Sequence, residues 1–106
     1  MIKSILVTLC IAATMTIASA QSVFVYYPEQ SQPTTQPVGQ CFPQVNAVGR
    51  LPMQISASGP LECYFYRERE CRVLTNLPPL PLGSEPVDLS FFPISPYGSI
   101  RCELSN

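Results

Sequence analysis

The chain has 106 residues, with six lysines and arginines against seven acidic residues and no histidine. Because it has no surplus of cations to neutralise phosphates, the composition argues against nucleic acid as a partner and against electrostatic docking to anionic membranes. The lack of histidine removes the usual general base and so excludes a Ser–His–acid catalytic triad.

Residues 1–20 have the pattern of a secretory signal peptide. Lys3 supplies a positive charge, residues 5–17 are apolar and uncharged, and the sequence Ala-Ser-Ala at 18–20 places small residues at the cleavage positions. The apolar run is shorter than the about 20 residues of a membrane-spanning helix, and threonines interrupt it. We therefore expect cleavage before Gln21 and a secreted, extracellular chain without a membrane span.

The chain that remains lacks the groups that catalysis needs. Removing residues 1–20 from 106 leaves 86 residues with five arginines, seven acids, no lysine and a net charge of −2. A Ser–Lys dyad is therefore excluded as well, and no spacing singles out a pair of carboxylates for glycoside hydrolysis. There is no glycine-rich phosphate loop. We predict a protein that is not an enzyme and holds no cofactor.

Four cysteines stay after cleavage, since Cys10 leaves with the signal. Cys41, Cys63, Cys71 and Cys102 in a short secreted chain predict two disulfides, with three possible pairings. A zinc site is the weaker interpretation, because their spacings include no C-x2-C pair and no histidine completes a ligand set. We expect disulfides and no metal.

The prolines and the short apolar runs predict an all-β domain. All twelve prolines follow residue 20, no stretch between them has a useful helical period, and the apolar runs are rich in β-branched and aromatic residues. In chain order, we expect a strand with its turn at 22–32, a loop at 34–40, an ambiguous segment at 41–49, a strand at 53–56, the strongest strand at 61–67, its return partner at 69–76, a proline-rich segment that is no central strand at 77–86, a short apolar piece at 87–95 and a last strand around 99–103.

Two weak similarities suggest an internal duplication of about 40 residues. Tyr26 and Tyr66 each follow three strand-forming residues and precede a polar turn, with an offset of 40. Residues 51–55 match residues 98–102 as a turn followed by a strand, with an offset of 47. With a duplication, residues 23–27 form a strand of the sheet. Without it, residues 21–40 form a flexible N-terminal arm.

A family resemblance rests on three short motifs, CYFY at 63–66, a cysteine at 71, and SIRC at 99–102 preceded by DLS at 88–90. In this combination the chain resembles small secreted fungal proteins with a βγ-crystallin-like Greek-key domain. The resemblance implies a single Greek-key β-sandwich over residues 21–106.

The chain departs from that family pattern at three places. Val73 stands where the pattern has a glycine, and Gly98 stands where it has the first of two serines. The calcium-binding pair of the family would fall near Ile94 and Ser95, which supply no carboxylate. The resemblance therefore implies the fold without implying a calcium site.

In this interpretation, the stretch CYFYREREC at 63–71 is a hairpin whose charged residues keep the turn in water. A Cys63–Cys71 bridge would close the turn, and the remaining Cys41–Cys102 bridge would join the two halves of the chain. This pairing is a hypothesis.

The resemblance implies a small monomeric protein that acts by binding an unknown extracellular protein or cell-surface target, in the manner of an effector or toxin. Two alternatives stay open. A protease inhibitor would present the proline-rich segment around Leu80 and Leu82 as a rigid loop. A cell-wall or carbohydrate-binding structural protein would stack sugars on tyrosines. The candidates are Tyr26, Tyr27, Tyr64, Tyr66 and Tyr97.

Export and oxidation can be tested with one measurement. We expect the intact mass of the secreted protein to begin at Gln21 and to show no alkylated thiol until a reductant is added. A mass that retains residues 1–20, or thiols that react in the native protein, would contradict both the signal peptide and the two bridges.

Overall fold

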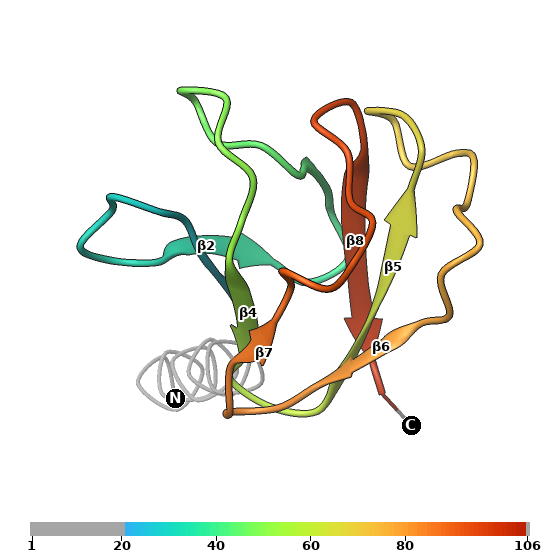
Figure 1. The fold of residues 1–106 in the computed structure, drawn as a ribbon. Coiled ribbons are helices and arrows are strands. Elements are labelled where there is room, and N and C mark those ends of the chain that lie inside the picture. The colour runs from blue at the N-terminus through green and yellow to red at the C-terminus, as the bar shows by residue number, and fades with distance from the viewer. Residues whose placement is uncertain (1–20, 106) are drawn as a thin grey trace, which may run out of the picture.

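The computed structural model describes residues 21–105 as two four-stranded antiparallel sheets packed as a sandwich, with no helix in that range (Figure 1). The predicted signal peptide, residues 1–20, lies outside the described residues. The strands are β1 (Ser22–Tyr26), β2 (Thr34–Pro37), β3 (Cys41–Pro43), β4 (Gln54–Ala57), β5 (Leu61–Tyr66), β6 (Leu80–Leu82), β7 (Val87–Asp88) and β8 (Ser99–Leu104). Within residues 21–105, no helix is long and apolar enough to cross a membrane. The predicted all-β class is confirmed.

The two halves of the chain interlock through an exchange of strands. One sheet has the order β2-β1-β4-β7, and the other has the order β3-β8-β5-β6. Each sheet thus holds the first, second and fourth strands of one half and the third strand of the other. Replacing β1 to β4 by β5 to β8, and the reverse, converts one order into the other, so the topology repeats.

The strand registers show how the two halves correspond. Val25 of β1 faces Ile55 of β4, and Phe65 of β5 faces Ile100 of β8. The offset between the halves is therefore 40 residues in the first strand, as predicted from the tyrosines, and 45 in the fourth. The match of 51–55 with 98–102 is out of register by two residues. The offset grows because the connection after β5 is longer than the connection after β1.

The core lies between the sheets and follows the alternation of the central strands. In β5, Leu61, Cys63 and Phe65 are buried while the residues between them are half-buried. β1 contributes Val23 and Val25 in the same way, and both are fully buried. A period of two is what a sheet with one covered face requires, and it puts these side chains against the opposite sheet.

The prolines that lie within strands are confined to the edges of the sheets. Edge strands β2, β3 and β6 contain Pro37, Pro43 and Pro81, and Pro86 directly precedes edge strand β7. The central strands β1, β4, β5 and β8 contain none. Proline has no N–H to donate to a ladder, so it is tolerated at an edge and also discourages pairing with another chain. The proline-rich segment 77–86 is thus no central strand, as predicted.

Three segments differ from the expectation. Residues 34–40, predicted as a loop, contain strand β2. Residues 69–76, predicted as the return partner of β5, make only the isolated bridge Tyr66–Leu74, because β5 pairs with β6 and β8 instead. Residues 21–40 are no arm, since β1 lies between β2 and β4 in its sheet.

Both predicted disulfides are present, but the predicted pairing is wrong. The bridges are Cys41–Cys71, with a Cα–Cα distance of 5.9 Å, and Cys63–Cys102, at 3.9 Å. Cys63 and Cys102 face each other on neighbouring strands β5 and β8, and both are buried. Cys71 lies beyond the end of β5, in a turn that brings it next to Cys41 of β3. By loop-closure entropy, each bridge stabilises the fold by about 4 kcal/mol.

A tryptic map of the oxidised protein tests this pairing, because the arginines separate all four cysteines. We expect peptide 21–50 linked to peptide 70–72, and peptide 51–67 linked to peptide 102–106. Mass spectrometry before and after reduction identifies both pairs. A link between 51–67 and 70–72 would contradict the structure and restore the hairpin bridge.

Candidate functional site

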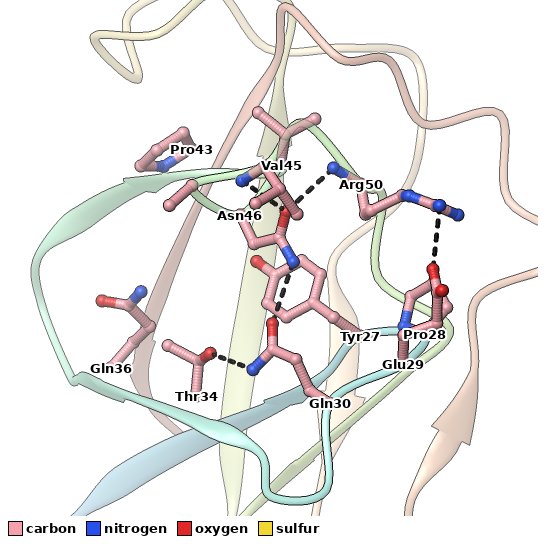
Figure 2. Close-up of a pocket in the computed structure, with 12 residues that line it drawn as sticks. Tyr27, Pro28, Glu29, Gln30, Thr34, Gln36, Pro43, Val45, Asn46 and Arg50 are labelled. Carbon is pink, nitrogen blue, oxygen red and sulfur yellow. Dashed lines mark hydrogen bonds and ion pairs between the residues drawn. The ribbon is translucent and has the colours of Figure 1, made fainter.

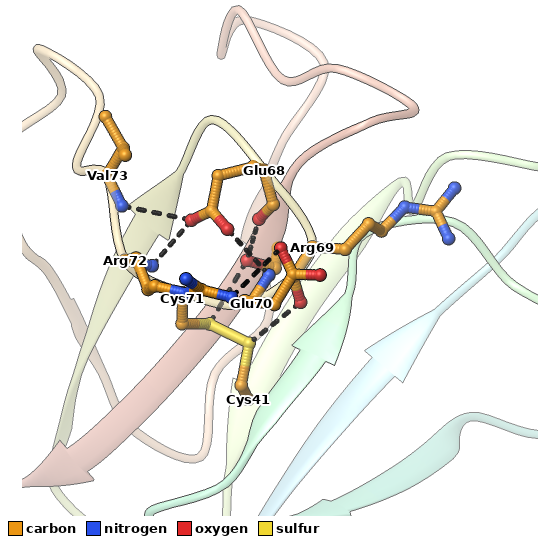
Figure 3. A network of polar contacts seen from close by, with 8 residues as sticks. Cys41, Glu68, Arg69, Glu70, Cys71, Arg72 and Val73 are labelled. Carbon is orange, nitrogen blue, oxygen red and sulfur yellow. Dashed lines mark hydrogen bonds and ion pairs between the residues drawn. A yellow bond between two sulfur atoms is a disulfide. The ribbon is translucent and has the colours of Figure 1, made fainter.

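The charged turn after β5 is held by its own carboxylate. The side chain of Glu68 accepts hydrogen bonds from the backbone N–H groups of Glu70 at 2.9 Å, Arg72 at 2.5 Å and Val73 at 3.0 Å (Figure 3). The bonds from Arg72 and then Val73 contribute most to lowering the pKa of Glu68 to about 2. They favour the ionised carboxylate because the proton of a neutral acid would compete with these donors.

The same turn is anchored to the rest of the sandwich at three points. The hydroxyl of Ser99 donates to the backbone carbonyl of Glu68, and the Arg69 guanidinium donates to the carbonyl of Pro96 at 3.0 Å. The Cys41–Cys71 bridge attaches the turn to β3 (Figure 3). Residues 67–73 are therefore a turn held by the bridge to Cys41, and not, as the sequence predicted, part of a hairpin at 63–71 closed by a Cys63–Cys71 bridge.

A groove opens at one flank of the sandwich, between the edge strands β2 and β3 (Figure 2). Its volume is about 650 Å³. We call it the β2–β3 groove. It is lined by Tyr27, Pro28, Glu29, Gln30, Thr34, Gln36, Pro43, Val45, Asn46, Ala47, Val48 and Arg50.

Strand β2 turns polar side chains toward the inside of the sandwich here. Gln36 faces Val23 and Thr34 faces Val25 across the ladder with β1, and both valines are fully buried. Residues that face each other in a ladder project to the same side of the sheet, so Gln36 and Thr34 project toward the opposite sheet. Polar side chains at inward positions need water or a ligand, which the groove admits.

Hydrogen bonds and an ion pair connect the two loops that form the groove. The side-chain amide of Asn46 donates to Gln30 Oε1 at 2.9 Å, and its oxygen accepts the N–H of Val48 at 3.1 Å and of Arg50 at 2.9 Å. Arg50 also pairs with Glu29 at 2.8 Å. These contacts join the β1–β2 turn to the β3–β4 loop beside the groove.

Tyr27 lines the groove as a structural residue. It is only 3 % exposed, and its hydroxyl donates to the backbone carbonyl of Gln44 at 3.1 Å. Burial raises the pKa of Tyr27 to about 12. Gln44 is itself buried, with its amide donating to Ser99 O and accepting from Ser95 N–H. These contacts fix the base of the groove and leave no open aromatic face.

The loops at the corresponding ends of the two halves have equal length. Residues 44–53 connect β3 to β4 and residues 89–98 connect β7 to β8, with ten residues in each. Both loops begin with the same contact, since Gln44 N–H donates to the Gly98 carbonyl and Leu89 N–H donates to the Met53 carbonyl. The 45-residue offset therefore holds along these loops.

In the second half, apolar side chains pack against the core at positions related to the groove of the first half. The offset relates Ala47 to Phe92, whose ring packs on Phe65 at a centroid distance of 5.9 Å. It also relates Gly49 to Ile94, and Phe92 and Ile94 both pack against the core. On the neighbouring strand, the registers relate Gln36 of β2 to Leu80 of β6, which also packs there. At these three positions, the first half has a small or polar residue where the second half has an apolar one.

Most other predicted candidates are placed away from a common site. Leu82 is buried and Leu80 packs on the core, so the proline-rich segment is an edge strand and no presented loop. Of the five tyrosines, only Tyr97 is largely exposed, at 73 %. Within residues 21–105, no group of three or more cysteine or acidic side chains could hold a metal ion.

Of the residues that line the groove, only Tyr27 was among the predicted binding candidates. Thr34, Gln36 and Asn46 lie in segments that the sequence assigned to a loop or left ambiguous. The sequence held no alternating signal there, because residues 34–36 between the two prolines are all polar.

Comparisons with protein-family models, curated proteins and solved structures found no match to this chain.

The Glu68 turn gives the chain a pH dependence that can be measured. Because the pKa of Glu68 is lowered from 4.5 to about 2 on folding, its ionised form stabilises the fold above pH 4.5, and this contribution disappears as the pH falls through about 2. We expect Glu68→Gln to lower the denaturation midpoint near neutral pH and to match the unsubstituted protein near pH 2.

Glu85→Gln is the matched control, since Glu85 is exposed in the connection between β6 and β7. Urea titrations of all three proteins between pH 2 and 7 make the comparison. A Glu68→Gln variant as stable as the control at every pH would show that the carboxylate does not hold the turn.

Proposed function

We propose that this chain is a secreted, non-enzymatic binding domain that recognises an extracellular target through the β2–β3 groove. The observation that carries the proposal is the difference between the halves: Gln36 and Ala47 line an open groove, whereas their counterparts Leu80 and Phe92 pack against the core. Filling that space would bury more apolar surface and stabilise the fold. An open, polar groove between loops that are joined by hydrogen bonds is better explained by ligand binding than by fold stability.

Export belongs to the same proposal. Two disulfides in a small domain are compatible with an oxidising, extracellular compartment. The pattern of residues 1–20 supports a signal peptide. We propose that the mature protein acts as a monomer on a protein or surface of another cell, in the manner of an effector or toxin.

We further propose that the sandwich is a βγ-crystallin-like pair of Greek keys. In a Greek key, the first strand lies between the second and the fourth. That order is found in β2-β1-β4 and in β6-β5-β8, with the third strand of each half crossing to the opposite sheet. This arrangement, together with the motifs at 63–71 and 99–102, supports the proposal.

The alternatives receive less support from the described residues. An inhibitor would present an exposed rigid loop, but Leu80 and Leu82 turn toward the core. A sugar-binding face would need open aromatic rings. Tyr27 in the groove is covered, and the exposed rings of Phe91 and Tyr97 lie in the loop between β7 and β8 and do not line the groove. Neither is favoured by a specific contact.

Cell-surface binding tests the function. We expect the oxidised, fluorescently labelled protein to bind saturably to intact cells of at least one type in a panel, and unlabelled protein to compete. An Ala47→Phe competitor, which puts the related aromatic side chain into the groove, should be at least tenfold weaker. Tenfold corresponds to about 1.4 kcal/mol of binding free energy.

Thr35→Leu is the control competitor, because Thr35 is exposed on the outer face of β2. It should compete like the unsubstituted protein. Absence of saturable binding across the panel would overturn the binding function, and equal competition by Ala47→Phe would remove the groove from it.

A further inference from the structure

We propose that the occupant of the β2–β3 groove is an extended, uncharged peptide segment that carries an apolar side chain. This inference rests on the proposed binding function and specifies its ligand. Four features of the groove select this class of ligand: its charge, its free hydrogen-bonding groups, its apolar walls and the way in which the other half of the fold is closed.

The residues that line the groove carry no net charge. Glu29 and Arg50 are the charged residues of its lining, and they pair with each other at 2.8 Å. A charged group bound there would lose water without gaining an unpaired counter-charge, which is unfavourable. Phosphorylated, strongly acidic or strongly basic ligands are therefore disfavoured.

The free polar groups of the groove match a peptide bond. Figure 2 shows the side-chain amide of Gln36 without a hydrogen bond to the other residues of the lining. The neighbouring inward residue on β2, Thr34, receives only a long contact of 3.4 Å from Gln30. An amide offers both an acceptor and donors, and a hydroxyl offers one donor. Together they satisfy the C=O and N–H of a peptide group.

The remaining walls are aliphatic. Pro28, Pro43, Val45 and Val48 supply them, and Val48 is 78 % exposed at the rim. No open aromatic ring is available for stacking against a sugar, since Tyr27 is covered. Pyrrolidine rings and valines suit apolar side chains, and they lose little conformational freedom on binding.

The second half of the fold shows what fills the related space. There, Phe92 and Ile94, from the loop between β7 and β8, and Leu80 of β6 each pack against the core. The whole loop, LSFFPISPYG at 89–98, carries no charge. Since the related positions in the first half are Ala47, Gly49 and Gln36, an incoming peptide with an apolar side chain can occupy the space that the chain itself leaves open.

Strand addition is not the mode of recognition. Pro37 on β2 and Pro43 on β3 remove backbone donors from the two edges that flank the groove. We therefore assign recognition to the Gln36 amide and to the aliphatic walls, and not to a new ladder along either edge.

The chain supplies a probe. A decapeptide with the sequence of residues 89–98, acetylated and amidated at its ends, should bind the ¹⁵N-labelled protein saturably at concentrations up to about 1 mM. The shifted amide signals should include residues 34, 36 and 46–48. Gln36→Leu, which removes the free amide, should weaken the peptide at least tenfold.

Matched controls keep the result specific. Thr35→Leu, on the outer face of the same strand, should bind within twofold of the unsubstituted protein, and thermal melts verify that both variants fold. A peptide with aspartate in place of its second phenylalanine, the equivalent of Phe92, should not bind. Chitohexaose and laminarihexaose, as uncharged sugars, should leave the groove signals unchanged.

Three outcomes would overturn the inference. These are no shift with the decapeptide, shifts outside the groove that Gln36→Leu does not alter, and groove shifts with either sugar. If the decapeptide fails while labelled protein still binds cells in competition with Thr35→Leu but not with Ala47→Phe, the proposed function stands and only the peptide assignment falls.

Discussion

The ladder between β5 and β8 is the interaction on which the rest of the structure depends. Its six facing pairs are the longest register in the sandwich, and the buried Cys63–Cys102 bridge lies within it. The ladder joins the last strand of the chain to the first strand of the second half. Because β3 pairs only with β8, this ladder also positions the strand that the first half contributes.

The corresponding ladder of the first half, between β1 and β4, contains no disulfide. The positions related to Cys63 and Cys102 are Val23 and Ala57, which face each other between β1 and β4 and are both buried. Apolar contact there takes the place of a covalent bond. Of the two bridges, Cys63–Cys102 lies within the second half, and Cys41–Cys71 joins the turn at 67–73 to β3 of the first half. The half that carries the groove is thus linked covalently to the second half through β3.

How far the sequence predicts this structure depends on how local each signal is. The strands β5 and β8 were expected within a residue or two, because their apolar residues alternate without proline. The strand β2 was missed, because the polar and proline-flanked sequence at 34–37 is typical of a loop until β1 pairs with it. The class of fold follows from such local patterns, whereas edge strands depend on neighbours that the sequence does not display.

The disulfide pairing and the groove could not be predicted from local sequence patterns, and the reason is the same for both. Cys63 and Cys71 are close in sequence, but the partner of Cys63 is set by the register of β8, 39 residues away. Likewise, whether Gln36 projects into the sandwich or into solvent is set by its pairing with Val23. One residue of slip in either ladder would reverse the faces. Sequence identified the cysteines correctly and could not pair them.

The comparison of the two halves supports a binding role for the groove. A repeated fold supplies an internal reference, because each position in one half has a counterpart under the same topological constraint. Where the counterparts are both apolar, as Val25 and Phe65 are, the position serves the core. Where Gln36 stands against Leu80, and Ala47 against Phe92, the second half packs an apolar side chain on the core and the first half does not. The hydrogen bonds between Asn46, Gln30 and Arg50 join the two loops that border this space. Loss of apolar burial together with added rigidity at one place is the combination that a preformed binding site requires.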